Sequence, residues 1–409
     1  MIIPRFSPSL DAKDMVAFIK GASSDDDAVS DFEKAFAKRV ERKHAIVVPS
    51  ARAGLYFLLK TCGCLESPIL IPALTYHAIP AVADLAGFKP HFIDIRADTL
   101  LMDEDLVEKV PDGEVGAIIP THLYGRVQNM DRIMDLARAR DWLVIEDVAQ
   151  GLGANWRGKP CGSFGDAAYF TFGPTKNFTT LGGGMIACDD DDWASRIRDM
   201  MKPVRQSSRF DSLTGAAYGF AMSVATTRII FSFALYPLLG LLKPSGIDII
   251  EAATADPPKD YPLPPKSFYE GGMRGAQAHV GMNQLKKLDM LGGKRRANVY
   301  RLLEYLEGVE GIRIPRPRDG EESVYMSFPV LVDDPDELSK RLIRLGVDTT
   351  RGYMSYCAQL AIFKDYARHC PVAADAAKHM LHLPVHAKVS SDALGHIARS
   401  VRSSLAFCT

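Results

Sequence analysis

The chain has 409 residues, of which 24% are charged and 47% hydrophobic, and its formal net charge is −1. This length exceeds one ordinary core, so we expect a large and a small domain of a soluble globular protein. The low net charge, without a basic run, argues against a nucleic-acid partner. Seven scattered cysteines and the lack of a signal-peptide pattern favour a cytosolic protein with reduced thiols and no metal site.

Short apolar strands alternate with helical patterns in the first half of the chain. Apolar residues recur at helical spacing between Val29 and Val40 and predict an amphipathic helix. Another helix is expected at 130–137, capped by Asn129. Buried strands are expected at 45–49, 68–72, 90–94, 115–120, 144–147, 169–172 and 185–188. The alternation indicates βαβ units, and therefore an α/β fold with a mostly parallel sheet.

Ligands on such sheets lie at the carboxyl ends of the strands. Several residues that follow predicted strands should gather there: Ser50, Tyr76, Asp94, His122 and Asp147. Ser50 also caps a helix that begins Ala51-Arg52, and a capped helix N-terminus is a natural seat for a phosphate group. Taken alone, such a turn is more often structural, and Tyr76 could either stack on a cofactor ring or fill the core.

An acid and an amine stand at the ends of two predicted strands. The most apolar strand of the chain ends on Asp147, and an aromatic strand runs through a Gly-Pro turn to Lys176. A pyridoxal phosphate (PLP) enzyme needs such a pair: the lysine forms the Schiff base, and the carboxylate keeps the pyridine nitrogen protonated. Burial would lower the pKa of Lys176 and free its neutral amine as a nucleophile. A lone lysine is usually a surface residue, so these features alone leave both a surface lysine and a PLP lysine open.

The segment 212–242 is unusually apolar. Arg228 is the only charged residue between Asp211 and Lys243, and 229–242 is an uncharged run. Fourteen residues are too few to span a bilayer, and Pro237 and Gly240 would interrupt a helix. A packing or dimer contact and a contact with a membrane surface or an apolar substrate both stay open.

The last third of the chain predicts a smaller α/β unit. A long helix is expected from about 277 to 306, a strand at 325–332, and a helix from 335 that stops at Gly346. We therefore divide the chain into a large domain at 1–270, which includes the N-terminal segment and an apolar insertion at about 205–265, and a unit at 271–409 that holds a connecting helix and a small C-terminal domain.

Four short motifs occur in one order between 144 and 185. They are Ile-Glu-Asp-Val-Ala-Gln at 145–150, Gly-Ser-Phe-Gly-Asp at 162–166, Pro-Thr-Lys-Asn at 174–177 and Gly-Gly-Gly at 182–184. The chain thereby resembles the DegT/DnrJ/StrS sugar aminotransferases, PLP enzymes of the aspartate aminotransferase fold (fold type I). Further matches in family order lie at 31–33, 48–50, 72–76, 120–125, 273–277 and 284–285. The resemblance covers most of 28–200 and 270–305.

The resemblance implies roles for particular residues. Lys176 would form the Schiff base and then move the proton, and Asp147 would pair with the pyridine nitrogen. Gln150 would contact the phenolic oxygen, and Tyr76 would stack on the ring. Thr171 and the backbone of Ala51 and Arg52, next to Ser50, would bind the phosphate.

The chain also departs from the family pattern. The family has Ser-Gly-Thr where this chain has Ser50-Ala51-Arg52, which leaves the role of Arg52 open. The family's Asn-x-Arg, whose asparagine reaches the partner subunit's cofactor, is Gly272-Met273-Arg274 here, so that contact is in doubt. The apolar segment is longer than in typical members.

The resemblance implies an aminotransferase that moves an amino group from an amino acid, with glutamate as the expected donor, to a nucleotide-linked keto sugar. It also implies a homodimer and, at the family level, a role in polysaccharide biosynthesis. One alternative is a fold type I enzyme acting on a non-sugar or lipid-linked carbonyl at a membrane surface, with 212–242 as the docking segment. The other is a non-catalytic regulatory homologue, which Asp147 and Lys176 argue against.

Overall fold

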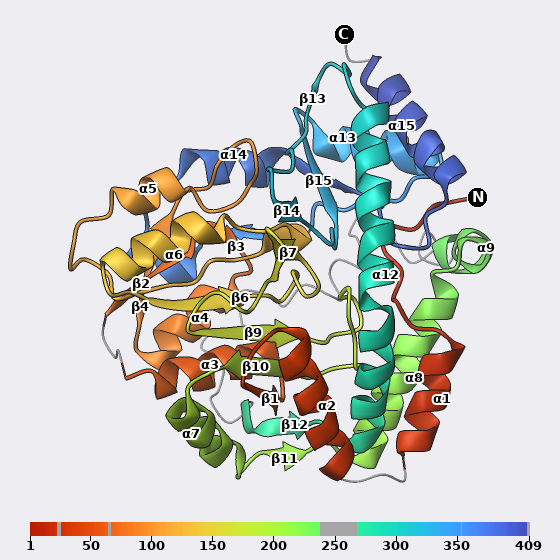
Figure 1. Ribbon diagram of the computed structural model, residues 1–409. Helices are drawn as coiled ribbons and strands as arrows, with labels where there is room; N and C mark the ends of the chain where they lie inside the picture. Colours follow the sequence, from red (N-terminus) through yellow and green to blue (C-terminus); the bar gives the residue numbers. More distant parts are fainter. Residues whose placement is uncertain (23–25, 64–66, 238–267, 353, 407–409) are drawn as a thin grey trace.

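The computed structural model describes residues 1–22, 26–63, 67–237, 268–352 and 354–406 (Figure 1). Its centre is a seven-stranded sheet whose strands lie in the order β1-β10-β9-β6-β5-β2-β4. Their bounds are β1 His44–Val48, β10 Gly184–Cys188, β9 Ala167–Thr171, β6 Leu143–Asp147, β5 Ala117–Ile118, β2 Pro68–Pro72 and β4 Lys89–Ile93. The strands from β9 to β4 are parallel, whereas β10 runs antiparallel to both neighbours. The predicted α/β class and mostly parallel sheet are thus confirmed.

Helices cover both faces of this sheet because successive strand residues point to opposite sides. One core holds Val144 and Phe170 with residues of α2, α6 and α12, and the other holds Ile145 and Tyr169 with residues of α3, α4 and α7. The helices are α2 Asp26–Arg39, α3 Ala51–Thr61, α4 Ala78–Ala86, α6 Met130–Ala139, α7 Asp191–Met201 and α12 Gly275–Tyr305. The helices predicted at 29–40 and 130–137 are α2 and α6, and Asn129 accepts the Arg132 N–H at 3.2 Å as the predicted cap.

A second, antiparallel sheet stands in the C-terminal part of the chain. It contains β13 Ile312–Arg313, β15 Phe328–Val332 and β17 Met380–Leu383, covered by α13 Pro335–Arg344 and α15 Ser391–Ala406. Gly346 follows α13 with a φ of 83°, as the predicted stop requires. The N-terminal segment joins this part, because Ile3 pairs with Val347. The domain boundary at 270/271 stays a proposal, since α12 packs against α1, α2 and α15 alike.

Shorter elements connect these layers. They are β3 Leu74–Thr75 with β16 Ser355–Tyr356; β7 Asn155–Trp156, β8 Lys159–Pro160 and β14 Glu321–Glu322; β11 Arg205–Gln206 with β12 Glu270–Gly272; α5 Glu104–Glu108; α14 Pro371–His379; and the 3₁₀ turns Leu123–Gly125, Cys357–Gln359 and Ala361–Tyr366.

The apolar segment begins in two helices beside the N-terminal helix α1 Ala12–Gly21. Helix α8 Arg209–Ala225 packs against α1 and α12 through a small core that includes Leu10, Phe18 and Ala216. After a break, α9 Arg228–Ile230 continues as a π-helical turn, Phe231–Leu235. Residues 238–242 of the predicted run, and the rest of the predicted insertion up to 265, lie outside the described residues. Within the described ranges no single helix is long and apolar enough to cross a membrane; α8 and 228–235 meet that test only together, and they are bent by 78°.

Candidate active site

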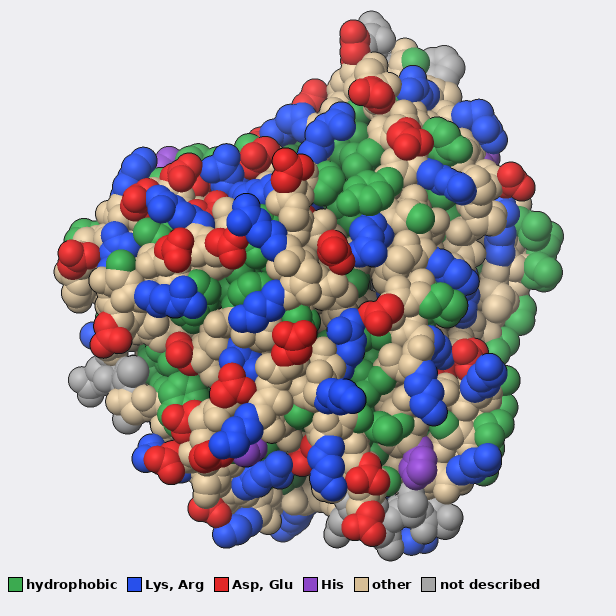
Figure 2. Space-filling model, in the orientation of Figure 1, with side chains coloured by type: hydrophobic (Ala, Val, Ile, Leu, Met, Phe, Trp, Pro, Cys, Tyr) green, Lys and Arg blue, Asp and Glu red, His purple; other side chains and the backbone are tan. Residues whose placement is uncertain are grey.

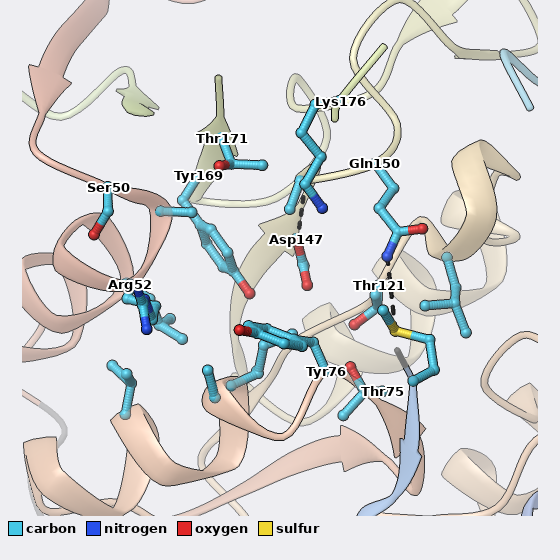
Figure 3. A pocket seen from close by; sticks show the side chains of 18 of the residues that line it. Ser50, Arg52, Thr75, Tyr76, Thr121, Asp147, Gln150, Tyr169, Thr171 and Lys176 are labelled. Atoms are coloured by element: carbon cyan, nitrogen blue, oxygen red, sulfur yellow. Dashed lines mark hydrogen bonds between the residues drawn. The ribbon is translucent and has the colours of Figure 1, made fainter. Parts of the chain in front are cut away.

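A cavity of about 220 Å³ lies at the carboxyl ends of β6 and β9 and the N-terminus of α3. Its lining includes the eight residues to which the resemblance gives cofactor roles: Ser50, Ala51, Arg52, Tyr76, Asp147, Gln150, Thr171 and Lys176. Figure 3 shows the Lys176 amine and the Asp147 carboxylate directed into the same space, with the Tyr76 ring on the opposite wall. The structure therefore brings these residues together, and their individual roles toward a cofactor remain predictions.

Asp147 is held rigidly at the end of β6. Its side chain is 2% exposed and accepts the Ala149 N–H at 2.9 Å, while its backbone bonds to Pro120 and His122 at 3.0 Å. Burial raises the pKa of Asp147, against the lowering effect of that hydrogen bond and of nearby Lys176. A buried carboxylate in this position is stabilised by a cationic partner. A protonated pyridine nitrogen in the cavity would be such a partner.

Lys176 follows the predicted Gly-Pro turn, in which its N–H bonds to the Gly173 carbonyl at 3.0 Å. Withdrawal from water lowers the pKa of Lys176, and the charge of Asp147 opposes this shift. The neutral, nucleophilic amine is therefore available at a lower pH than for an exposed lysine.

Three buried hydroxyl groups line the cavity wall, those of Thr75, Thr121 and Tyr169 (Figure 3). The two threonine hydroxyls have no hydrogen-bond partner among the described residues. The Tyr169 hydroxyl interacts with the Asp147 carboxylate; burial and this carboxylate raise the pKa of Tyr169 well above its ordinary value, so this hydroxyl is a proton donor. Buried polar groups without partners are costly, and two of them at one cavity indicate that a polar ligand satisfies them. The sequence prediction missed all three hydroxyls.

The wall beside β9 is suited to an anion. The Ser50 hydroxyl accepts the Ala53 N–H at 3.1 Å, so it caps α3, and the positive end of the helix faces the cavity next to Arg52 and Thr171. β10 approaches this helix end closely: a Cβ on Gly184 would lie 2.9 Å from the Ala51 nitrogen. PLP needs an anion site for its phosphate, a carboxylate for its ring nitrogen and a lysine amine for its aldehyde. The N-terminus of α3 with Thr171, Asp147 and Lys176 offer these groups, so the cavity fits this cofactor.

Glu146, which precedes Asp147, holds the backbone behind the cavity in place through its hydrogen bonds. Glu146 is fully buried and accepts the N–H groups of Gly162, Phe164 and Gly165 at 2.7–2.9 Å, which folds the 162–166 motif around it. Its charged partners are the Nε2 atom of His122, at 3.1 Å, and the buried guanidinium of Arg42, at 3.7 Å. Burial opposes the imidazolium form, but Cys161 and Glu146 outweigh it and raise the pKa of His122 to about 10. His122 thus supports the Asp147 strand from behind the cavity.

One residue expected at this edge lies elsewhere. Asp94 accepts the Val372 and Ala373 N–H groups at 3.0 and 2.8 Å and so caps α14. The sequence places it correctly at the end of a strand, but that strand, β4, is the edge of the sheet, away from β6. The expected cluster of five therefore reduces to Ser50, Tyr76 and Asp147 in the cavity, with His122 behind it.

Removing the charge of Glu146 is expected to destabilise the fold. Glu146→Gln removes the buried carboxylate that contacts both His122 and Arg42, so the free energy of unfolding should fall by about 3–5 kcal/mol, measured by denaturant titration. The double variant with His122→Gln should recover part of this loss, because no unpaired charge remains. Losses that simply add in the double variant would show that the two side chains are not coupled.

A smaller cavity of about 40 Å³ adjoins the first and shares Gln150, Thr175 and Met354 with it. His382 of β17 lines it: the side chain is buried, Nδ1 lies 3.1 Å from the Ser327 hydroxyl, and Nε2 has no partner among the described residues. Burial lowers the pKa of His382 to about 3, so the ring is neutral. No sequence motif distinguishes this histidine, because its place in the cavity wall depends on tertiary packing that brings β17 beside Tyr124 and Gln150.

Comparison with known proteins identifies the family. Residues 14–228 and 267–402 match the DegT/DnrJ/EryC1/StrS aminotransferase family, so the chain belongs to that family. The resemblance inferred from the motifs is thus confirmed, and PLP is the cofactor that family membership assigns. Residues 229–266, which contain most of the apolar insertion, fall outside the match.

Individual relatives show how far the similarity extends. The chain is 39% identical to the GDP-perosamine synthase of Caulobacter vibrioides over 171 residues, 42% of this chain and 46% of that protein. It thus spans about half the length of this relative. Over 404 residues it is 26% identical to the dTDP-3-amino-3,4,6-trideoxy-alpha-D-glucose transaminase of Micromonospora megalomicea, covering 96% and 93%. The solved Helicobacter pylori aminotransferase PseC superimposes with a TM-score of 0.78 over the whole of both chains at 18% identity, which confirms the fold.

Proposed function

We propose that the protein is a PLP-dependent aminotransferase that transfers an amino group from an amino acid, with glutamate as the expected donor, to a nucleotide-linked keto sugar. The convergence of Lys176 and Asp147 on one cavity, beside an anion seat, carries the proposal. The family membership and the names of two relatives, a GDP-perosamine synthase and a dTDP-amino-sugar transaminase, support the reaction and the substrate class.

In this proposal PLP supplies an aldehyde that condenses with amines and a ring that accepts the electron pair released when a proton leaves the neighbouring carbon. The protein supplies the positions. Asp147 would hold a proton on the ring nitrogen. Gln150, whose Oε1 accepts the Tyr124 N–H at 2.9 Å and whose amide nitrogen lies 3.7 Å from the Met354 sulfur, would contact the ring's phenolic oxygen. The N-terminus of α3, with Ser50, Ala51, Arg52 and Thr171 around it, would hold the phosphate, and Tyr76 would cover one face of the ring.

In this proposal Lys176 carries the proton that leaves the substrate carbon. Its amine is the one basic nitrogen that the labelled residues of Figure 3 direct toward Asp147. With its pKa lowered by burial, the neutral amine can take a proton from the substrate carbon and return it at the other end of the same three-atom unit. The same group serves both half-reactions.

The smaller cavity is proposed to hold part of the sugar acceptor. Its polar groups are neutral: His382 is uncharged, and Arg5 is neutralised by Asp348, to which it bonds at 2.7 and 2.9 Å. Neutral donors and acceptors beside apolar side chains such as Met354 suit sugar hydroxyl groups. The unsatisfied Nε2 of His382 is the position we assign to one of them.

His382→Ala is therefore expected to raise the KM for the keto-sugar acceptor roughly tenfold, the effect of one lost hydrogen bond, and to leave the half-reaction with the amino donor within about twofold. His382→Gln, which keeps neutral hydrogen-bonding atoms, should restore much of the affinity, and His369→Ala on the surface is the matched control. An equal loss in both half-reactions, with a lowered unfolding temperature, would make His382 a purely structural residue.

A direct test uses the purified protein reconstituted with PLP. L-Glutamate should bleach the visible band of the bound cofactor and release 2-oxoglutarate, and adding nucleotide-linked keto sugars should restore the band and yield an amino sugar detectable by mass spectrometry. A protein that develops no such band even with excess PLP is not a PLP enzyme. A band that responds to glutamate but to no keto sugar would shift the assignment to another carbonyl acceptor.

Two further expectations belong to this proposal: a homodimer and a cytoplasmic location. The dimer rests on the family, in which a second subunit completes the site, and light scattering of the holoprotein measures it. An acceptor presented on a lipid at a membrane surface is the second candidate. The exposed apolar side chains of α8 and 228–235 favour it.

A further inference from the structure

An ordinary surface helix buries its large apolar residues and exposes its polar ones. Helix α8 differs, because it buries mainly small residues and exposes large apolar ones. Its buried side carries small residues, Ala216, Gly219 and Ser223. The Ser223 hydroxyl bonds to the Leu10 carbonyl at 2.8 Å, and a Cβ on Gly219 would lie 2.5 Å from the side chain of Leu181. The helix therefore lies close to the body of the protein through small side chains and the partly buried Phe220, and most of its other large side chains point outward.

The outward side of α8 is apolar along its length. Phe210, at 74% exposure, begins a row at helical spacing that continues through exposed Leu213, Ala217, Tyr218, Ala221 and Val224. Thr214 is the one polar residue among those exposed between Ser212 and Val224. A contiguous exposed apolar face of this kind marks an interaction surface rather than a solvated one.

The same surface continues on both sides of α8. Past the 78° bend, Ile229 is 65% and Phe233 is 73% exposed. On the neighbouring helix α1, Met15, Val16 and Ile19 are also exposed. Figure 2 shows hydrophobic side chains along the edge of the molecule where α9, α8 and α1 lie in Figure 1. We call this set of residues on α1, α8 and 228–235 the apolar face.

Five exposed basic residues belong to the elements of the apolar face or directly precede them: Lys13 and Lys20 of α1, Arg205 of β11, Arg209 of α8 and Arg228 of α9. The acidic residues of the same helices are engaged locally. Asp14 is buried, Asp11 pairs with Lys287 at 2.8 Å, and Asp211 bonds to the Ser208 hydroxyl at 2.6 Å. The border of the apolar face is thus predominantly cationic.

We propose that the apolar face docks on an anionic lipid bilayer, with its helices lying in the plane of the interface. Large apolar side chains with a border of lysine and arginine are what an interfacial helix presents to lipid chains and anionic headgroups. The bend between α8 and 228–235 excludes one straight crossing by these two helices. A two-fold contact between copies would bring the same cationic borders together, so charge complementarity favours lipid over a second copy.

This surface is separate from the proposed catalytic function. None of the apolar-face residues belongs to the lining of either cavity at the active site. Its outer part, from Ile229 onward, lies outside the region that matches the family, so it is a feature of this chain rather than of the common fold. Docking and transamination can consequently fail independently.

The test is co-sedimentation of the full-length holoprotein with vesicles of phosphatidylglycerol and phosphatidylcholine, compared with phosphatidylcholine alone. Binding should be stronger on the anionic vesicles and should weaken with salt, because the charge contribution is screened. The variant Phe210→Ser/Ile229→Ser/Phe233→Ser should lower the partition coefficient on the order of tenfold or more, since three apolar side chains no longer enter the lipid. The matched control is Met290→Ser/Leu345→Ser/Ile362→Ser, which removes three exposed apolar residues elsewhere.

Both variants should keep the PLP absorbance and the unfolding temperature of the parent protein, because the replaced residues are exposed and outside the cavities. Wild type that stays in the supernatant with both vesicle types overturns the proposal, as does equal loss of binding in the two variants. Two results would assign the apolar face to other occupants and also overturn it. Concentration-dependent protection of α8 from hydrogen exchange without vesicles indicates a second copy, and concentration-independent protection indicates another segment of this chain.

Discussion

Lys176→Ala is expected to lower the rate of transamination by roughly 10⁴-fold or more, since the variant loses both the amine that holds the cofactor covalently and the group that moves the proton. The anion seat at α3 and the Tyr76 wall are unchanged, so PLP should still bind non-covalently. Borohydride treatment followed by peptide mass spectrometry should find the cofactor on Lys176 in the parent protein and on no lysine in the variant.

Lys202→Ala is the control for this experiment, because Lys202 is an exposed lysine whose only described ion pair is with nearby Asp199. It should keep parental turnover and the same labelled peptide. Two results would show that Lys176 is not the lysine that binds PLP: a Lys176→Ala protein with parental turnover, or a labelled peptide elsewhere in the chain.

Asp147→Asn is expected to lower turnover on the order of 10²–10³-fold, because the ring nitrogen loses its anionic partner and the ring becomes a weaker electron acceptor. The amide is isosteric and can still accept the Ala149 N–H, so the fold and the phosphate seat should persist. The visible spectrum of the bound cofactor should shift even where turnover is too slow to measure. Asp199→Asn at the surface is the matched control.

The same variant tests the charge coupling between the two residues. Burial lowers the pKa of Lys176 below the ordinary 10.5, and the Asp147 charge partly reverses this shift. Covalent attachment of PLP to the apo-protein should therefore rise with pH through a midpoint below 10.5, and in Asp147→Asn that midpoint should move further down. A midpoint that moves up would contradict the sign of the coupling.

The sheet was predictable because its strands are short, apolar and separated by helical patterns, and each predicted strand is present. The eight residues to which the resemblance gives cofactor roles, from Ser50 to Lys176, all line the cavity. Residues whose contribution comes from tertiary packing were missed. Thr75, Thr121 and Tyr169 look like ordinary strand residues in the sequence. The structure shows that the two threonine hydroxyls have no partner among the described residues at this cavity and that the Tyr169 hydroxyl interacts with Asp147.

The errors have physical reasons as well. Strand ends are readable from the sequence, but the order of strands is not, so Asp94 was grouped with Asp147 although β4 and β6 are not neighbours. The composition of 212–242 shows that the segment is apolar, but it does not show which face of its helix is buried. The buried face is set by the small residues Ala216 and Gly219, which let α8 lie close to the body of the protein with most of its large side chains exposed.

The N-terminal segment touches both halves of the proposed chemistry. Ile3 is paired with Val347 and Arg5 is bound to Asp348 in the wall of the smaller cavity, while the Ser9 hydroxyl bonds to the carbonyl of Asn177, next to Lys176, at 3.2 Å. A tag or deletion here would disturb the proposed acceptor cavity and the loop that carries Lys176 at once, although no residue of this segment lines the first cavity. Fusions for activity assays therefore belong at the other end of the chain.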